Sequence, residues 1–266
     1  MLKVENISKI FNAGTVNEKV ALDELSLTLE SGDFVTVIGG NGAGKSTLLN
    51  SVAGTYPVDG GKIYIDDTDV TKLPEYKRAK YIGRVFQDPM VGTAGDMWIE
   101  ENMALAMRRG KSRGFSWAIK NADRIHFREL LSQLDLGLEN RLSTKVGLLS
   151  GGQRQAITLL MASMNNPKLL LLDEHTAALD PKTAAKVLDI TNKIVEQNKL
   201  TTLMITHNMS DAIRLGNRLI MMSEGKIILD IKGEEKQSLT VSDLLKKFEI
   251  ASGSKLENDR MLLNND

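Results

Sequence analysis

Residues 39–46 read Gly39-Gly40-Asn41-Gly42-Ala43-Gly44-Lys45-Ser46, which fits the pattern G-x-x-x-x-G-K-[ST]. An apolar run, Asp33–Gly40, precedes them and predicts a buried strand, and a helix is predicted over Lys45–Ala53. Between a strand and a helix, such a loop wraps its backbone N–H groups around nucleotide phosphates, and the helix N-terminus adds positive potential. We expect Lys45 to reach the β- and γ-phosphates and Ser46 to ligate Mg²⁺. The nucleotide-binding residues predicted in this segment are Gly39, Asn41, Gly42, Ala43, Gly44, Lys45, Ser46 and Thr47.

Around the loop, the order of elements predicts an α/β fold. The first third is rich in strands, with Leu2–Phe11 and Val20–Leu29 joined by a turn at Asn12–Asn17. By contrast, Trp98–Gln133 is helical, and Arg108–Gly114 interrupts it as an expected loop between helices. The last third alternates between strand and helix, which predicts a mostly parallel sheet with helices on both faces. The alternating elements are strands at Lys168–Asp173, Thr201–Thr206 and Arg218–Met222, and helices at Pro181–Gln197 and Ser210–Leu215.

Two acids close the strand Lys168–Asp173, whose last residues are four leucines and Asp173, followed by Glu174. In an open α/β sheet, ligands bind at the carboxyl ends of the strands. Asp173 is therefore expected to hold Mg²⁺, directly or through water, and Glu174 to polarise the attacking water as general base. An acid at a strand end is also an ordinary solvated turn, and only the phosphate loop favours the catalytic interpretation.

Composition narrows the class of protein. Lys plus Arg and Asp plus Glu number 34 each, so the formal net charge is zero, which argues against a nucleic-acid partner. The chain has no cysteine, which favours a reducing compartment. No apolar run approaches the roughly 18 residues of a membrane span. We therefore expect any membrane role to depend on a partner protein.

A third motif is the most specific. Leu149-Ser150-Gly151-Gly152-Gln153 resembles the signature of ABC-type ATPases. The other motifs of that family are also present, in the family's order, and the resemblance covers residues 2–232. Gln87 matches the Q-loop, Asp180 the D-loop and His207 the switch histidine, and Phe11 stands where the family places an aromatic ring under adenine. Other nucleotide-binding families share the phosphate loop but not this set.

The resemblance implies roles for these residues, with ATP and Mg²⁺ as cofactors. Ser150, Gly151, Gly152 and Gln153 would serve the ATP bound to the opposite subunit of a head-to-tail dimer. Asp180 would also lie at this composite site. His207 would sense the γ-phosphate, and Gln87 would contact Mg²⁺ and the attacking water. The predicted catalytic residues are Glu174, His207, Lys45 and Gln87, and the predicted metal ligands are Ser46, Gln87 and Asp173.

The resemblance also implies a P-loop NTPase (RecA-like) fold with a mostly parallel core sheet, an N-terminal antiparallel β-subdomain and an inserted α-helical subdomain. We expect the ATPase domain to span residues 1–232. Its core would comprise 1–86 and 159–232, and its helical subdomain 87–158. Residues 233–266 would form a C-terminal helix and a loose polar tail.

Three stretches are similar to one bacterial subgroup: Val91–Asn102, Arg108–Gly114 and Asp173–Ala178. Members are ATPase subunits encoded with a permease and a substrate-binding lipoprotein, and are described as tryptophan/tyrosine uptake systems. This implies an importer subunit, most simply a homodimer, at the cytoplasmic face of the membrane; another planar or hydrophobic nutrient is an open alternative. An exporter ATPase and a non-transport ABC ATPase are alternatives. A fused exporter would carry membrane spans, and the non-transport types carry a second cassette or a long coiled coil.

Two features are left open. His175 follows Glu174 where the family commonly has proline. It either tunes the pKa of Glu174 or titrates near neutrality, or it is a tolerated variant. The cations Arg108, Arg109, Lys111 and Arg113 predict an exposed loop that faces water or an anionic partner.

Overall fold

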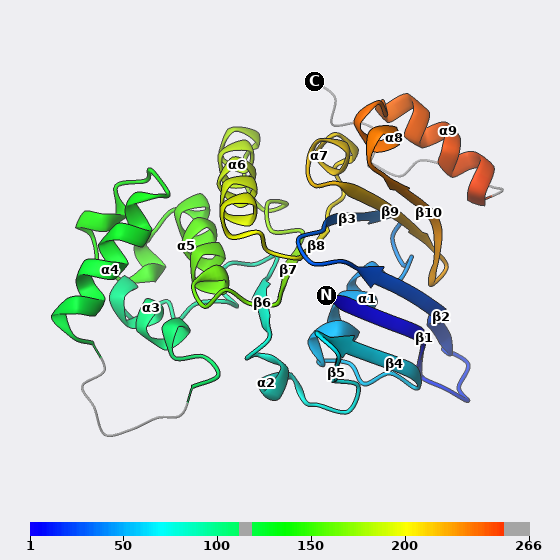
Figure 1. The fold of residues 1–266 in the computed structure, drawn as a ribbon, viewed down its shortest axis with the longest axis horizontal. Helices are drawn as coiled ribbons and strands as arrows, with labels where there is room; N and C mark the ends of the chain where they lie inside the picture. Colours follow the sequence, from blue (N-terminus) through cyan, green and yellow to red (C-terminus); the bar gives the residue numbers. More distant parts are fainter. Residues whose placement is uncertain (112–118, 253–266) are drawn as a thin grey trace.

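The computed structural model describes residues 1–111 and 119–252 and contains two sheets with helices between and outside them (Figure 1). The larger sheet has the strand order β10-β9-β3-β8-β7-β6. Its neighbours pair in parallel except β10, which is antiparallel to β9. The strands are β3 (Phe34–Gly39), β6 (Ile82–Val85), β7 (Leu169–Asp173), β8 (Thr202–Ile205), β9 (Arg218–Ser223) and β10 (Lys226–Lys232). The predicted α/β class and mostly parallel sheet are confirmed.

The smaller sheet is antiparallel, with the order β2-β1-β4-β5. Its strands are β1 (Leu2–Phe11), β2 (Lys19–Leu29), β4 (Gly60–Ile65) and β5 (Thr68–Asp69). The hairpin turn between β1 and β2 lies where the sequence predicts it, and Thr15 N–H donates to the Asn12 carbonyl. The expected N-terminal antiparallel layer is therefore present.

Helix α1 (Lys45–Ala53) packs between the two sheets. The side chains of each strand in the large sheet alternate between its two faces, and both faces are covered by other elements. Leu169 and Leu171 of β7 point into the core that includes α1 and the small sheet. Leu170 and Leu172 point into the opposite core, with helices α5 (Gly151–Ser163) and α6 (Pro181–Asn198). A run of leucines suits such a strand because successive side chains alternate between the faces.

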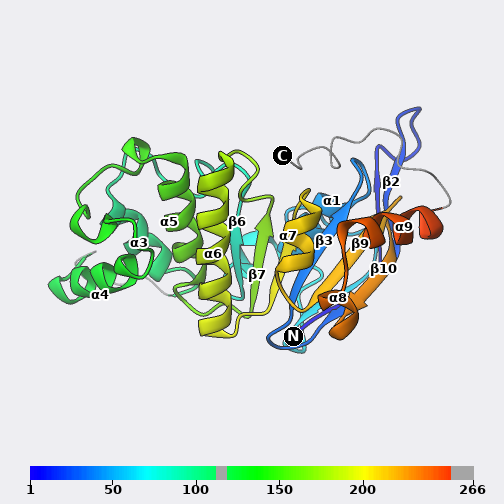
Figure 2. The ribbon, with the colours of Figure 1, turned by 90° about the horizontal axis from the view of Figure 1, so that it is seen from above.

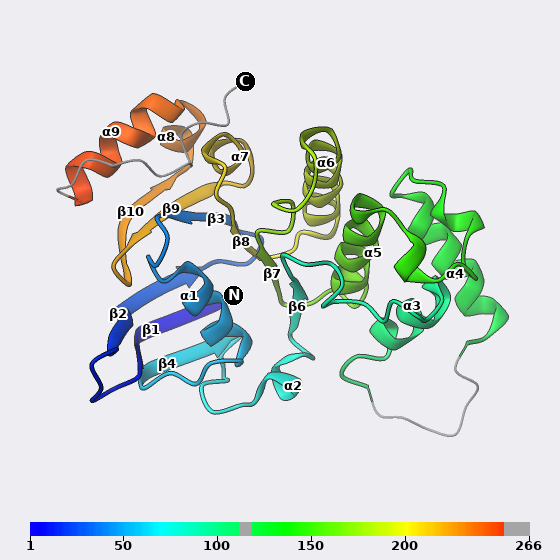
Figure 3. The same cartoon turned by 180° about the vertical axis from the view of Figure 1, so that it is seen from behind.

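Helix α7 (Met209–Arg214) covers the same face as α6, farther along the sheet (Figure 2). The helices between β6 and β7 in the sequence extend beyond the β6 edge of the sheet (Figure 3). There, α5 packs against α3 (Ile99–Met107) and α4 (Asn121–Ser132). The predicted helical region Trp98–Gln133 is interrupted from Arg108 onward, as the sequence predicts. It is two helices, separated by a turn at Arg108–Lys111 and by residues 112–118, which lie outside the described part.

Several short or peripheral elements were not predicted from the sequence. They include β10, the short helices α2 (Glu75–Arg78) and α8 (Glu234–Gln237), and the two-residue strand β5. The predicted C-terminal helix is α9 (Val241–Ser252), which packs on β10 and α7. The predicted loose tail lies outside the described residues, and the domain bounds stay a prediction. Over residues 1–111 and 119–252, no helix is both long and apolar enough to cross a bilayer.

Candidate functional site

The sheet topology gathers four of the predicted motifs at one edge. Strands β3, β8, β7 and β6 are parallel neighbours, so their carboxyl ends lie side by side. The phosphate loop follows β3, His207 follows β8, Glu174 follows β7, and Gln87 follows β6. This edge is where open α/β sheets bind ligands.

The phosphate loop is held tightly by its surroundings. Gly44 has φ +99°, and a Cβ there would lie 2.5 Å from the Ala21 carbonyl oxygen, so glycine is required. The Lys45 ammonium is buried and donates to the carbonyls of Gly39 at 2.7 Å and Gly40 at 3.0 Å. The cation therefore lies over the start of the loop, beside the N-terminus of α1, and both features suit a bound phosphate.

Glu174 and His207 lie in contact across the ends of β7 and β8. The Glu174 carboxylate contacts His207 Nε2, and the side chains are 11% and 37% exposed, respectively. Glu174 has φ +44°, an uncommon backbone conformation for a residue with a side chain. The carboxylate is thus held by both a constrained turn and a histidine, as a positioned proton acceptor requires.

Asp173 is half-buried beside an arginine that sequence reasoning missed. Burial raises the pKa of the Asp173 carboxyl, and the Arg84 guanidinium, 3.9 Å away, opposes that rise. Arg84 also donates to Asn50 Oδ1 at 2.7 Å and stacks 4.4 Å over the Phe86 ring. A cation in the otherwise apolar strand Ile82–Val85 was the available signal, because strands buried on both faces seldom carry one.

The proposed metal ligands come from three neighbouring elements. Ser46 is in the first turn of α1, Asp173 ends β7, and exposed Gln87 follows β6. Hydroxyl, carboxylate and amide oxygens are the donors that Mg²⁺ accepts. Three such donors leave room for phosphate oxygens and water around the ion. In the described part of the chain, no cluster of three His, Cys, Asp or Glu could hold a metal.

Ser150 caps helix α5 at a distance from this edge. Its Oγ accepts from Gln153 N–H at 3.3 Å, while Gln153 Oε1 accepts from Ser150 N–H at 3.2 Å. Three strand spacings of about 4.8 Å separate β3 from β6, or about 14 Å, and α5 packs on the far side of β6 (Figures 1 and 3). The structure therefore brings Lys45, Glu174 and His207 together and leaves Ser150 apart.

Asp180 lies near the Ser150 motif of the same chain. It caps α6, and its carboxylate accepts from Thr183 N–H at 3.1 Å. A Cβ on Gly151 would lie 3.1 Å from Leu179 Cδ2, and one on Gly152 would lie 2.2 Å from Thr183 Cγ2. The two motifs thus form one surface where α5 meets α6.

Phe11 ends β1 and packs edge-on against Tyr56, with ring centroids 5.4 Å apart and planes at 83°. The Lys9 ammonium lies 5.6 Å from the Phe11 ring centroid and pairs with Asp59. The Phe11 side chain is half-buried. The sequence predicted a role for Phe11 only. Tyr56, which follows α1, lies in no recognisable motif and was missed.

His175 is buried and neutral. Its Nε2 lies 2.9 Å from Thr191 Oγ1, and the Thr191 hydroxyl donates to the Val187 carbonyl, so the histidine Nε2–H must be the donor to Thr191. Burial lowers the pKa of His175 to about 4. The interpretation that His175 titrates near neutrality is therefore wrong, because low dielectric penalises the imidazolium.

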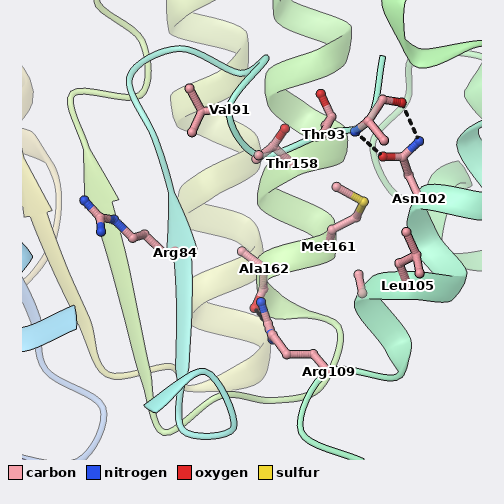
Figure 4. Close-up of a pocket in the computed structure, with 12 residues that line it drawn as sticks. Arg84, Val91, Thr93, Asn102, Leu105, Arg109, Thr158, Met161 and Ala162 are labelled. Carbon is pink, nitrogen blue, oxygen red and sulfur yellow. Dashed lines mark hydrogen bonds between the residues drawn. The ribbon is translucent and has the colours of Figure 1, made fainter. Parts of the chain in front are cut away.

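A pocket of about 410 Å³ opens between α3, α5 and the segment after Gln87 (Figure 4). Asn102 bridges the Ala94 N–H and carbonyl at its rim, and Arg109 donates to the Ala162 carbonyl at 2.8 Å. Arg109 is thus half-buried, which corrects the prediction that all four cations of the basic stretch face outward; Arg113 lies outside the described residues. Lining residues include Arg84, Val91, Thr93, Leu105, Thr158 and Met161.

Comparison with known proteins gives consistent matches. The family model described as ABC transporter matches residues 22–177. The tyrosine transport ATP-binding protein of Clostridioides difficile is 45% identical over 94% of this chain and 100% of its own length. The energy-coupling factor transporter ATP-binding protein EcfA2 of Caldanaerobacter subterraneus is 32% identical over 93% of this chain and 84% of its own.

Solved structures agree with the fold. The dimeric ATP-binding cassette MJ0796, in a post-hydrolysis state bound to ADP and Pi, superposes with a TM-score of 0.74 at 30% identity, over 87% of this chain and 98% of that one. The ADP conformation of the cassette MJ1267 gives 0.76 at 29% identity, over 96% and 99%. Each is a nucleotide-binding cassette of similar size.

Proposed function

The chain belongs to the ABC transporter family as an ATP-hydrolysing subunit, and from that membership we propose that it powers uptake of an aromatic amino acid through a separate permease. The observation that carries the ATPase assignment of residues is the contact of Glu174 with His207 beside the phosphate loop. Support for the substrate class is the 45% identity to a tyrosine transport protein along nearly the whole chain. Importer names among the other relatives favour uptake over export.

The roles of the residues follow from their positions. Lys45 neutralises phosphate charge. Glu174 accepts a hydrogen bond and then a proton from the attacking water, while His207 holds the Glu174 carboxylate in place. Mg²⁺, bound by Ser46 and Asp173, would add positive charge at the phosphates. The constrained Glu174 turn reduces the motion needed to align the base.

We infer that two copies act together. Ser150 is the N-cap of a 13-residue helix, and Ser150 and Gly151 are exposed at its start, so the positive end of the helix can meet an anion. The distance from its own phosphate loop favours the anion of a second subunit. A head-to-tail homodimer would place each ATP between Lys45 of one chain and Ser150 of the other.

The permease would bind in the pocket of Figure 4, which lies beyond Gln87. Val91 and Leu105, both in its lining, are 64% and 53% exposed. A pocket that combines exposed apolar side chains with polar ones suits an amphipathic helix of a partner. This contact would hold the subunit at the cytoplasmic face of the membrane, and a substrate-binding lipoprotein would deliver the nutrient outside.

Glu174→Gln tests the catalytic assignment. The amide keeps the shape but cannot accept the proton, so we expect hydrolysis to fall about 100- to 10,000-fold, with ATP binding retained. Glu249→Gln, an exposed change on α9, is the matched control and leaves turnover unaltered. Near-normal turnover by Glu174→Gln would show that another group activates the water.

A further inference from the structure

Lys19 is a cation near the phosphate loop that no motif accounts for. It begins β2, and its ammonium lies 3.0 Å from the position that a Cβ on Gly42 would occupy. Gly42 is in the middle of the loop, at φ +80°. Lys19 is exposed and, among the described residues, its ammonium makes no hydrogen bond or ion pair.

The strand register links Lys19 to the expected adenine site. Phe11 and Lys19 are directly opposite partners in the antiparallel pair β1–β2. Opposite residues of such a pair project from the same face of the sheet. Their shared face looks toward the phosphate loop, because that is where the Lys19 ammonium lies. Phe11 is therefore next to Lys19 on this face, and the Lys19 ammonium is next to Gly42 in the phosphate loop. We call this arrangement a path from the ring to the loop.

This path matches a nucleoside di- or triphosphate: a base on Phe11, phosphates in the loop, and a cation between them. We propose that Lys19 is an additional nucleotide-binding residue whose ammonium pairs with the α- or β-phosphate. The proposal rests on the proposed function of the loop. Lys19 would be distinct from Lys45, which is buried on the inner side of the loop, at the carbonyls of Gly39 and Gly40.

Because both ADP and ATP carry the α- and β-phosphates, the contact strengthens both equally. Uniform binding of this kind changes KM and leaves kcat unaltered. We expect Lys19→Met, which keeps an unbranched stem without the charge, to raise the Kd of both nucleotides about tenfold, between the effects of an exposed ion pair and a charge-assisted hydrogen bond. The effect shrinks at high salt, and Lys19→Arg retains most of the affinity.

The experiment measures Kd for ADP and for ATP with Mg²⁺ on the full chain by calorimetry, alongside steady-state kinetics. Lys232→Met is the matched control: Lys232 is exposed, and it pairs with Arg218 at the opposite, amino-terminal edge of the sheet. Equal Kd values for Lys19→Met, Lys232→Met and the unchanged chain overturn the proposal, as does a shift confined to ATP. If the unchanged chain binds neither nucleotide, the proposed function itself fails.

Discussion

At the scale of single residues, the buried His175 makes stability depend on pH. Its pKa is about 4 in the folded chain and about 6.5 when unfolded. Between these values only the unfolded chain binds the proton, so the free energy of unfolding falls as pH drops through this window. The full loss is about 3 kcal/mol, at about 1.4 kcal/mol per pKa unit.

We expect His175→Gln to remove that component, since glutamine does not titrate and its amide can still donate to Thr191. Urea denaturation of both chains at several pH values between about 4 and 6.5 measures it. Gln197→Asn, an exposed change on α6 that involves no titratable group, is the control and leaves the slope unaltered. Parallel stability curves for His175→Gln and the unchanged chain would contradict the neutral, buried histidine.

Sequence motifs predicted those functional residues whose roles depend on neighbours along the chain. Lys45, Asp173 and Glu174 follow from the sequence because each lies in a short motif beside a recognisable strand or helix. Arg84 and Lys19 do not, because their contacts cross between elements distant in the sequence. The state of His175 depends on packing against Thr191, which a motif cannot reveal.

At the scale of elements, the close contact of α5 and α6 depends on Gly152. A Cβ there would lie 2.2 Å from Thr183 Cγ2, and threonine is stiff at χ1. Gly152→Ala should therefore destabilise the chain by about 1–3 kcal/mol through overpacking, although alanine favours a helix by about 1 kcal/mol.

Removing the opposing methyl should rescue that variant. We expect Gly152→Ala with Thr183→Ser to regain the lost stability and, with it, ATPase activity, because the Ser150 and Asp180 motifs share this contact. Chemical denaturation of the two single variants and the double variant provides the comparison. If Thr183→Ser fails to rescue Gly152→Ala, the α5–α6 contact is not the cause.

Element boundaries followed from the sequence where capping residues mark them. Ser150 and Asp180 cap α5 and α6, and Pro181 opens α6. Strand β10 was missed although Glu224-Gly225 forms a turn between two apolar runs, the ordinary signal of a hairpin. The break after α3 was predicted, because the basic, glycine-containing stretch Arg108–Gly114 interrupts an otherwise helical composition.

At the scale of the whole molecule, how subunits assemble is harder to predict from one chain's sequence than the fold class is. Composition and motifs predicted the α/β class and an inserted helical region, because periodicity and order along the chain encode them. The separation of Ser150 from the phosphate loop needed the sheet order β3-β8-β7-β6. Only that order shows that one chain does not surround its own phosphate site.

The head-to-tail dimer makes the final prediction. The chain has no cysteine, so Asn41→Cys and Leu148→Cys, in separate chains, introduce single thiols beside the phosphate loop and the Ser150 motif. Within one chain these regions are separated by more than the about 14 Å between β3 and β6, too far for a disulfide, whose Cβ atoms lie about 4 Å apart. Mixing the two chains with ATP, both carrying Glu174→Gln to slow turnover, should yield a crosslinked dimer on oxidation, detected by non-reducing electrophoresis.

Each single-cysteine chain alone is the control and stays monomeric on the gel. A chain carrying both thiols that closes an internal disulfide, with none formed between chains, would contradict the dimer.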